Sequence, residues 1–147
     1  MRVLTILLTL PLLLACSGET AAPATADAAE VAKPVMLGGV DLNQPLRVIG
    51  TEPFWAVEIT PDTLTYSGVE RPEQVFLTPG ADVQGTTAVY AVENEGESSI
   101  KVTVMATECS DGMSDRIYPL TAMVEIGDET LNGCGQSVAA MMAEPRP

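Results

Sequence analysis

Reactive and ligand-binding side chains are concentrated between residues 108 and 116. This stretch reads ECSDGMSDR, so nine residues hold three carboxylates, two hydroxyls and one guanidinium. Asp111, Ser114 and Asp115 offer oxygen atoms to a hard cation, but their spacing differs from that of an EF-hand loop. The same residues also suit a plain turn, in which Asp and Ser bond to the backbone and Arg116 pairs with a carboxylate.

A rigid polar loop is also a common recognition surface, so this stretch can be interpreted as a binding site as well. We therefore take Asp111, Ser114, Asp115 and Arg116 as candidate binding residues.

The aromatic pair Phe54 and Trp55 is a second candidate site. It follows the sequence GTEP and joins the only tryptophan to one of two phenylalanines. Both rings at a strand start can fill the interior of a barrel, or they can form an aromatic platform for a ligand at its mouth. Phe54 and Trp55 are therefore included among the candidate binding residues.

The composition excludes several classes of activity. The chain has no histidine, so it has no Ser-His-Asp triad, no Cys-His pair and no His-ligated zinc. Its net charge of -13 repels phosphates, and we expect no nucleic-acid partner. Ser114 lacks a base, since Lys33 is expected in a linker and Lys101 in mid-strand. We predict no enzymatic activity, no cofactor and no metal site.

The beginning of the chain predicts export. Arg2 supplies a positive start, and the apolar run at residues 3–14 follows it. As a helix this run spans about 18 Å, which is too short for the ~30 Å hydrocarbon core of a bilayer. The pattern is that of a signal peptide at residues 1–15 rather than a membrane span.

The run ends in LLAC, and this sequence resembles the lipobox of bacterial lipoproteins. The resemblance implies cleavage before Cys16 and attachment of fatty acyl groups such as palmitate to it. Ser17 in the next position implies sorting to the outer membrane, with the protein facing the periplasm. The alternative is an ordinary secretory signal that carries a cysteine by chance.

The rest of the chain divides into a linker and one domain. Residues 16–34 are rich in Ala, Thr, Pro and acidic residues and lack large apolar side chains, so we predict a flexible tether. No polybasic patch is present to hold anionic lipid, and the membrane contact is expected to come from acyl chains. Residues 35–147 form the predicted folded domain.

Short alternating apolar runs predict that this domain is all-β. We expect a small antiparallel barrel or sandwich of about seven to eight strands, with a two-residue turn at Gly127-Asp128 and a short helical turn at residues 138–143. The expected strands are at residues 46–49, 54–59, 64–66, 74–77, 87–93, 99–105, 120–126 and 129–131.

The chain has three cysteines, so acylation of Cys16 leaves two that can pair with each other. In an oxidising compartment Cys109 and Cys134 are expected to form a disulfide, worth about 3 kcal/mol in the chain-entropy model. The alternatives are a redox pair or a thiolate metal site, but the chain has no CxxC motif and no histidine.

Three motifs together resemble a known family. They are GTEPFW at residues 50–55, CSDGMSDR at residues 109–116 with Tyr118-Pro119, and Gly133-Cys134. The set is similar to a family of uncharacterised bacterial membrane-anchored or periplasmic lipoproteins, whose members often accompany META domains or domains of C-type lysozyme inhibitors. The resemblance implies an envelope location and a disulfide, and it brings no activity and no catalytic residue.

Two functions follow as hypotheses. The first is a non-catalytic binding or envelope-maintenance lipoprotein, with the disulfide-pinned loop as its contact surface. The alternative is an inhibitor of a basic wall-degrading enzyme such as a C-type lysozyme, because an acidic body attracts a basic protein partner.

Overall fold

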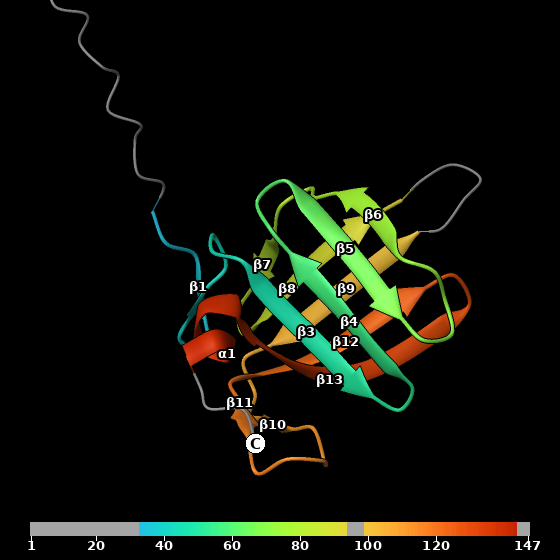
Figure 1. The fold of residues 1–147 in the computed structure, drawn as a ribbon. Coiled ribbons are helices and arrows are strands. Elements are labelled where there is room, and N and C mark those ends of the chain that lie inside the picture. Colours follow the sequence, from blue (N-terminus) through green and yellow to red (C-terminus); the bar gives the residue numbers. More distant parts are fainter. Residues whose placement is uncertain (1–32, 94–98, 144–147) are drawn as a thin grey trace, which may run out of the picture. The chain divides into compact units, whose positions relative to one another are not determined.

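Nearly all of the folded domain is β-structure. The computed structural model describes residues 33–93 and 99–143 (Figure 1). The main sheet consists of β3 (Leu46–Thr51), β4 (Phe54–Ile59), β5 (Thr63–Gly68), β6 (Gln74–Leu77), β7 (Asp82–Gln84), β8 (Thr87–Val92), β9 (Ile100–Met105), β12 (Leu120–Ile126) and β13 (Glu129–Ser137). Smaller elements are β1 (Met36–Leu37) with β2 (Val40–Asp41), β10 (Cys109–Ser110) with β11 (Ile117–Tyr118), and helix α1 (Val138–Ala143).

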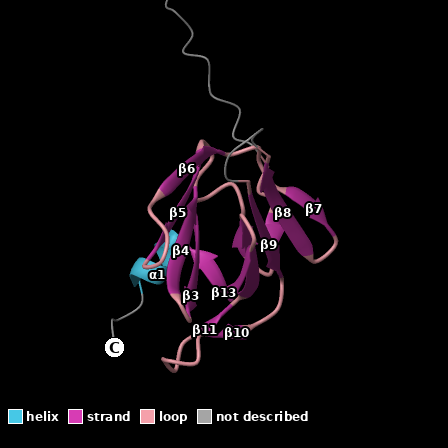
Figure 2. Cartoon of the chain, turned by 90° about the vertical axis from the view of Figure 1, so that its right-hand side faces the viewer, coloured by secondary structure: helices cyan, strands magenta, loops and turns pink. Residues whose placement is uncertain are grey.

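The main sheet is antiparallel throughout and curls into a half-barrel. Its strand order is β6-β5-β4-β3-β13-β12-β9-β8-β7, and Figure 2 shows the two halves of the sheet facing each other. Hairpins build each half, while the pairing of β3 with β13 joins them, with Ile49 opposite Cys134. This long-range ladder brings the N-terminal strands against the last strand of the chain.

A bent segment supplies both outer strands of the sheet. In the antiparallel order β6 and β7 run in the same direction, and only residues 78–81 separate them. Pro79 lacks an amide hydrogen and Gly80 has a φ of 86°, so the strand ladder is interrupted here. One half of the segment pairs with β5 and the other with β8.

The core fills the inside of the curled sheet. Every second residue points inward, as the period of a strand requires, so Trp55, Val57 and Ile59 of β4 share the buried face. On the outer face Arg47 lies opposite Glu58 in the register and forms an ion pair with it. Other buried side chains of the core include Leu46, Val48, Leu64, Tyr66, Phe76, Tyr90, Ile100, Val102, Val104, Leu120, Val124 and Ile126.

The all-β prediction is confirmed, and all eight expected runs form strands. Two differences have local causes. Strand β13 continues to Ser137, beyond the expected end at residue 131, because Gly133 and Gly135 interrupt the apolar alternation without ending the ladder. Strand β7 was not expected, because residues 82–84 are mostly polar and flanked by loop residues.

The signal peptide, Cys16 and most of the tether lie outside the described residues. Within the described part of the chain, no helix has the length and apolar character needed to cross a bilayer.

Candidate functional site

The predicted loop is a small hairpin held against the outside of the barrel. Strands β10 and β11 pair with Cys109 opposite Tyr118. A disulfide joins Cys109 to Cys134 on β13, with 5.5 Å between their Cα atoms, so the predicted pairing is confirmed. Cys134 is almost fully buried, because its side chain points to the outer face of the sheet and the hairpin covers it there. The hairpin is thus fixed to the sheet at its base.

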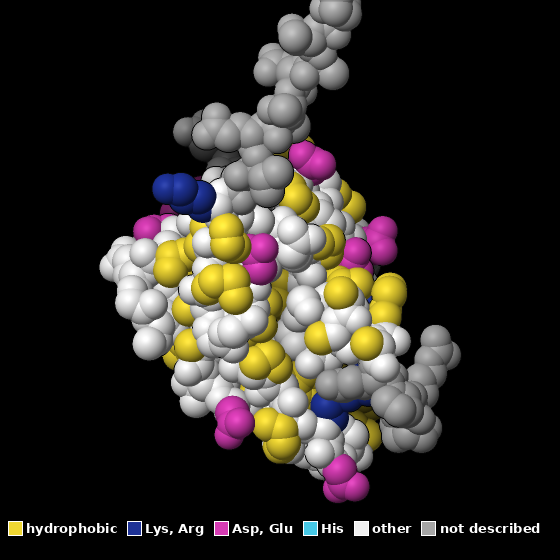
Figure 3. Space-filling view, turned by 90° about the vertical axis from the view of Figure 1, so that its left-hand side faces the viewer, with side chains coloured by type: hydrophobic (Ala, Val, Ile, Leu, Met, Phe, Trp, Pro, Cys, Tyr) yellow, Lys and Arg dark blue, Asp and Glu magenta, His cyan; other side chains and the backbone are white. Residues whose placement is uncertain are grey.

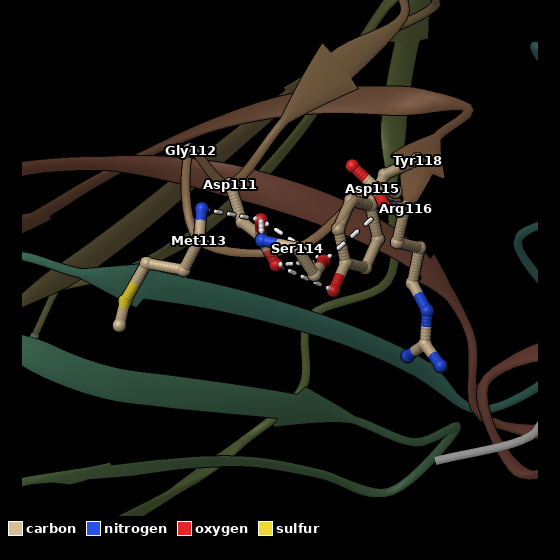
Figure 4. A pocket seen from close by; sticks show the side chains of 7 residues that line it. All are labelled: Asp111, Gly112, Met113, Ser114, Asp115, Arg116 and Tyr118. Carbon is tan, nitrogen blue, oxygen red and sulfur yellow. Dashed lines mark hydrogen bonds between the residues drawn. The ribbon is translucent and has the colours of Figure 1, made fainter. Parts of the chain in front are cut away.

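Asp111 organises the tip of this hairpin (Figure 4). Its Oδ1 accepts hydrogen bonds from the backbone amides of Met113, at 3.0 Å, and Ser114, at 2.9 Å. The Ser114 hydroxyl lies 3.1 Å from Oδ1 and 2.9 Å from Oδ2. The Tyr118 hydroxyl donates to Oδ2 over 3.2 Å. One carboxylate therefore satisfies donors from three residues and closes the loop on itself.

The surroundings of Asp111 and Tyr118 also determine which of the two groups carries a proton at neutral pH. Burial disfavours the charged form of Asp111, but the hydrogen bonds from Ser114, Met113 and Tyr118 outweigh it and hold the pKa of Asp111 below its usual value. Burial raises the pKa of Tyr118, and the charge of Asp111 adds to this rise. At neutral pH the loop therefore contains a carboxylate that accepts a hydrogen bond from a neutral phenol.

The other side chains of the hairpin face outward. Met113 is 67% exposed and Ile117 is 57% exposed, and Asp115 is exposed as well. The Arg116 guanidinium lies 5.9 Å from the centre of the Tyr118 ring, within the range of a cation–π contact. A hollow of about 620 Å³ is formed by residues 111–116 together with Tyr118. Of the four predicted loop residues, Asp111 and Ser114 hold the loop, whereas Asp115 is presented to solvent.

The aromatic pair is split between two environments. Trp55 is 4% exposed and Phe54 is 55% exposed, because neighbouring residues of a strand point to opposite faces. The Trp55 indole fills the barrel beside Gly50 and Gly133, where any Cβ atom would overlap it. Its Nε1 has no hydrogen-bond partner in the described chain. Trp55 thus fills the interior of the barrel, whereas Phe54 does not.

Trp55 and the loop do not line one cavity. A separate hollow of about 360 Å³ lies along Phe54, Trp55 and Val69. The two sites meet at Thr51, whose hydroxyl donates to the backbone oxygen of Asp111 over 3.2 Å. Thr51 is the Cα partner of Phe54 in the β3–β4 ladder, so the exposed ring lies on the same side of the molecule as the loop.

Sequence reasoning missed Thr51, Tyr118 and the two exposed apolar side chains, Met113 and Ile117, as parts of this surface. Tyr118 lies two residues after the end of the polar stretch, and that position could have signalled its role. Nothing in the sequence pattern pointed to Thr51, because it lies 60 residues from Asp111 in the chain. Within residues 33–93 and 99–143 no cluster of three or more His, Cys, Asp or Glu side chains is placed to hold a metal ion.

Comparisons of the chain with protein-family models, with curated proteins and with solved structures found no match.

Proposed function

We propose that this chain is a lipid-anchored, non-catalytic binding protein of the bacterial cell envelope. Its contact surface consists of Thr51, Phe54 and residues 111–117, and we name it the loop surface. The partner on this surface is a protein, because the barrel is filled and the loop offers exposed side chains around a closed polar centre. Exposed side chains on a rigid support favour a broad protein contact over the enclosure of a small ligand.

The observation that supports this proposal best is that the Asp111 carboxylate is already hydrogen-bonded within the loop. This carboxylate accepts hydrogen bonds from Met113, Ser114 and Tyr118, so its role is to fix the shape of the loop and not to bind a substrate. A loop shaped before binding loses little conformational entropy when a partner arrives. The outward side chains Met113 and Ile117 then supply apolar contact area.

The anchor and the envelope location rest on the lipobox at Cys16 and on the resemblance to the lipoprotein family. The Cys109–Cys134 disulfide is consistent with an oxidising compartment such as the periplasm. Growth with labelled palmitate should label the full chain, and the Cys16→Ser variant should carry no label. Unlabelled wild-type chain in the outer-membrane fraction would contradict the anchor.

A photo-crosslinking amino acid at position 113 tests the loop surface in the producing cell. We expect one discrete adduct from position 113 and none from Leu77, which is similarly exposed on β6. The adduct should disappear when Asp111→Ala is added, because that change releases the loop without altering the crosslinking residue. An adduct that persists in this variant, or no adduct at all, would overturn the proposal.

Deletion of the gene tests the envelope-maintenance role. The deletion strain should become more sensitive to detergents and antibiotics, and the wild-type gene should restore resistance. The Asp111→Ala gene should fail to do so at equal protein levels. An unchanged sensitivity profile would remove this role.

Inhibition of a basic wall-degrading enzyme is a second candidate, and the charge distribution favours it. The described residues include fourteen Asp and Glu against five Lys and Arg. Glu52, Glu108 and Asp115 are all exposed; Asp115 belongs to the loop surface, and the other two lie near it in the sequence. Mixing residues 33–147 with C-type lysozyme should slow the lysis of cell walls, and Asp115→Asn should weaken this effect. Undiminished lysis at molar excess would exclude this enzyme as the target.

A further inference from the structure

A second hollow, of about 550 Å³, lies beside helix α1 and shares no lining residue with the loop surface. We name it the α1 hollow. It is bounded by the β1–β2 hairpin, by the end of β13 and by α1. Its lining is mostly apolar and consists of Gly38, Gly39, Val40, Asp41, Gln44, Pro45, Pro119, Gln136, Ser137, Val138, Ala139, Ala140 and Met142.

Helix α1 is apolar throughout, yet only Val138 and Met141 are even partly buried. Its sequence is VAAMMA, and none of its residues is buried. Met142 is 80% exposed, and Met36 on the neighbouring hairpin is 54% exposed. In Figure 3, which shows the side of the molecule that carries β1 and α1, hydrophobic side chains are spread over the middle of the face. Such a surface is stabilised when an apolar partner covers it.

A buried amide at the α1 hollow also lacks a partner. Gln136 is 2% exposed, and its Nε2 donates to no acceptor in the described chain. An unpaired buried donor is costly, because it has given up water without a replacement bond. An occupant that brings an oxygen acceptor together with apolar surface would satisfy both features of the hollow.

The charge of this face restricts the occupant. Among residues 33–93 and 99–143, Asp41 is the only carboxylate that lines the α1 hollow, although acidic residues dominate this part of the chain. The Asp41 side chain accepts a hydrogen bond from the backbone amide of Asn43, so it also serves a local turn. The face can therefore approach an uncharged surface at small electrostatic cost, whereas the acidic remainder of the domain is repelled by anionic lipid.

The chain joins the folded domain at the rim of this hollow. The backbone oxygen of Lys33 accepts a hydrogen bond from the Asn43 side chain over 2.8 Å, between Asp41 and Gln44 of the lining. A flexible tether of the predicted kind, over the length of residues 16–32, would reach roughly 21–25 Å. A domain of this size is about 35 Å across. A tether of that reach brings the face around Lys33 to an anchoring membrane more readily than the far side of the domain.

We propose that this face, formed by Met36, α1 and the α1 hollow, docks on the surface of a bilayer of zwitterionic lipid. Met36 and Met142 enter the acyl region, and the ester carbonyls of the lipid offer acceptors near Gln136. The inference rests on the proposed lipid anchor. Residues 111–117 do not line the α1 hollow, so docking on this side leaves the exposed side chains of the loop surface available for a protein partner, although the β10–β11 hairpin is a neighbour of α1 in Figure 1.

A tethered fluorescence experiment tests this docking without the natural lipidation. The disulfide leaves Cys16 as the remaining thiol of residues 16–147, so this chain can be coupled to a maleimide lipid in phosphatidylcholine vesicles. Met142→Trp and Leu77→Trp provide a matched pair, because their side chains are 80% and 81% exposed and β6 lies across the sheet from α1 in Figure 1. The native Trp55 adds the same background fluorescence to both variants.

We expect brominated phosphatidylcholine to reduce the fluorescence added at position 142 about twofold and to leave that at position 77 unchanged. Adding Met36→Asp to Met142→Trp should abolish the reduction, since a carboxylate resists insertion. Equal quenching at positions 142 and 77 would overturn the proposal, as would no quenching at either. Dimers of the uncoupled chain that Met142→Asp dissociates would also overturn it, because the face would then bind a second copy. Palmitate labelling of Cys16 in cells reports separately on the anchor.

Discussion

The barrel interior and the loop surface are ordered by different kinds of interaction. The interior depends on many apolar side chains that pack against one another, and no single contact dominates. The loop depends on one carboxylate, that of Asp111, and on one disulfide at its base. Packing of the interior tolerates exchanges of similar volume, whereas the loop is sensitive to the loss of single atoms.

Phe54 and Trp55 show the same contrast within one dipeptide. Trp55 contributes to the interior and Phe54 to the loop surface, although both are large aromatic residues. Burial area is the main source of stabilisation by an aromatic ring, so the two rings should differ greatly in their effect on folding.

Truncation of these two rings should produce the largest difference in the free energy of unfolding. We expect Trp55→Ala to lower the free energy of unfolding by about 3–5 kcal/mol, because it empties a closely packed site. Phe54→Ala should change it by less than about 0.5 kcal/mol, because the ring is exposed. Urea unfolding of the two variants measures both values. Similar losses would show that the two rings are not partitioned between interior and surface.

Removal of the disulfide should have the next largest effect. The double change Cys109→Ser with Cys134→Ser should cost about 3 kcal/mol, since it frees the unfolded chain from a closed loop. A reductant should lower the unfolding midpoint of the wild-type chain to that of the double variant and leave the variant unchanged. A wild-type midpoint that does not respond to full reduction would contradict this expectation.

Alkaline pH should weaken the interior through the ionisation of Tyr90. Burial raises the pKa of Tyr90 to about 12, above its ordinary value of 10.0. The folded chain therefore keeps this proton longer than the unfolded chain does. The resulting stabilisation is complete below pH 10 and is lost as the pH rises through 12, a loss of ~2–3 kcal/mol.

Tyr90→Phe should remove this loss. At neutral pH it should leave the stability unchanged or higher, because the buried Tyr90 hydroxyl has no partner. Thermal unfolding between pH 7 and 12 measures the difference. A strongly destabilised Tyr90→Phe variant at pH 7 would show that the hydroxyl makes a bond in solution.

Acid should weaken the loop surface through Asp111, and this is the smallest expected effect. The pKa of Asp111 lies below its ordinary value of 3.8, so its charge stabilises the loop above that pH and the effect is lost as the pH falls through the folded pKa. Asp111→Asn should raise amide exchange at Met113 and Ser114 about tenfold, with a global change of under about 1 kcal/mol. Acidification should have the same local effect in the wild type but not in the variant.

Strand positions were predictable because alternation is a local property. The runs around Val57, Val102 and Val124 each present one apolar face, and each forms a strand whose buried side chains are the expected ones. The turn at Gly127-Asp128 also forms as expected, with a φ of 58° at the glycine. Covalent geometry imposes the two-residue period within a few residues, so no knowledge of distant contacts is needed.

The candidate site was predictable only in part. The loop between Cys109 and Tyr118 was found from its polar residues, and the disulfide from the cysteine count and the expected compartment. The direction of the Asp111 side chain was not predictable. A cation-binding loop and a plain turn use the same residue types, so the sequence does not distinguish between them. The role of Thr51 depends on a contact between segments 60 residues apart.

Local sequence was sufficient to specify an acidic all-β domain with a short C-terminal helix and a single internal cysteine pair. Long-range packing set the rest. The pairing of β3 with β13 places Gly50 and Gly133 together, and this creates the space that Trp55 fills. The same curvature leaves α1 and its hollow uncovered on one side. Alternation tells which side chains share a face, but the partner of each face depends on contacts between residues far apart in the chain.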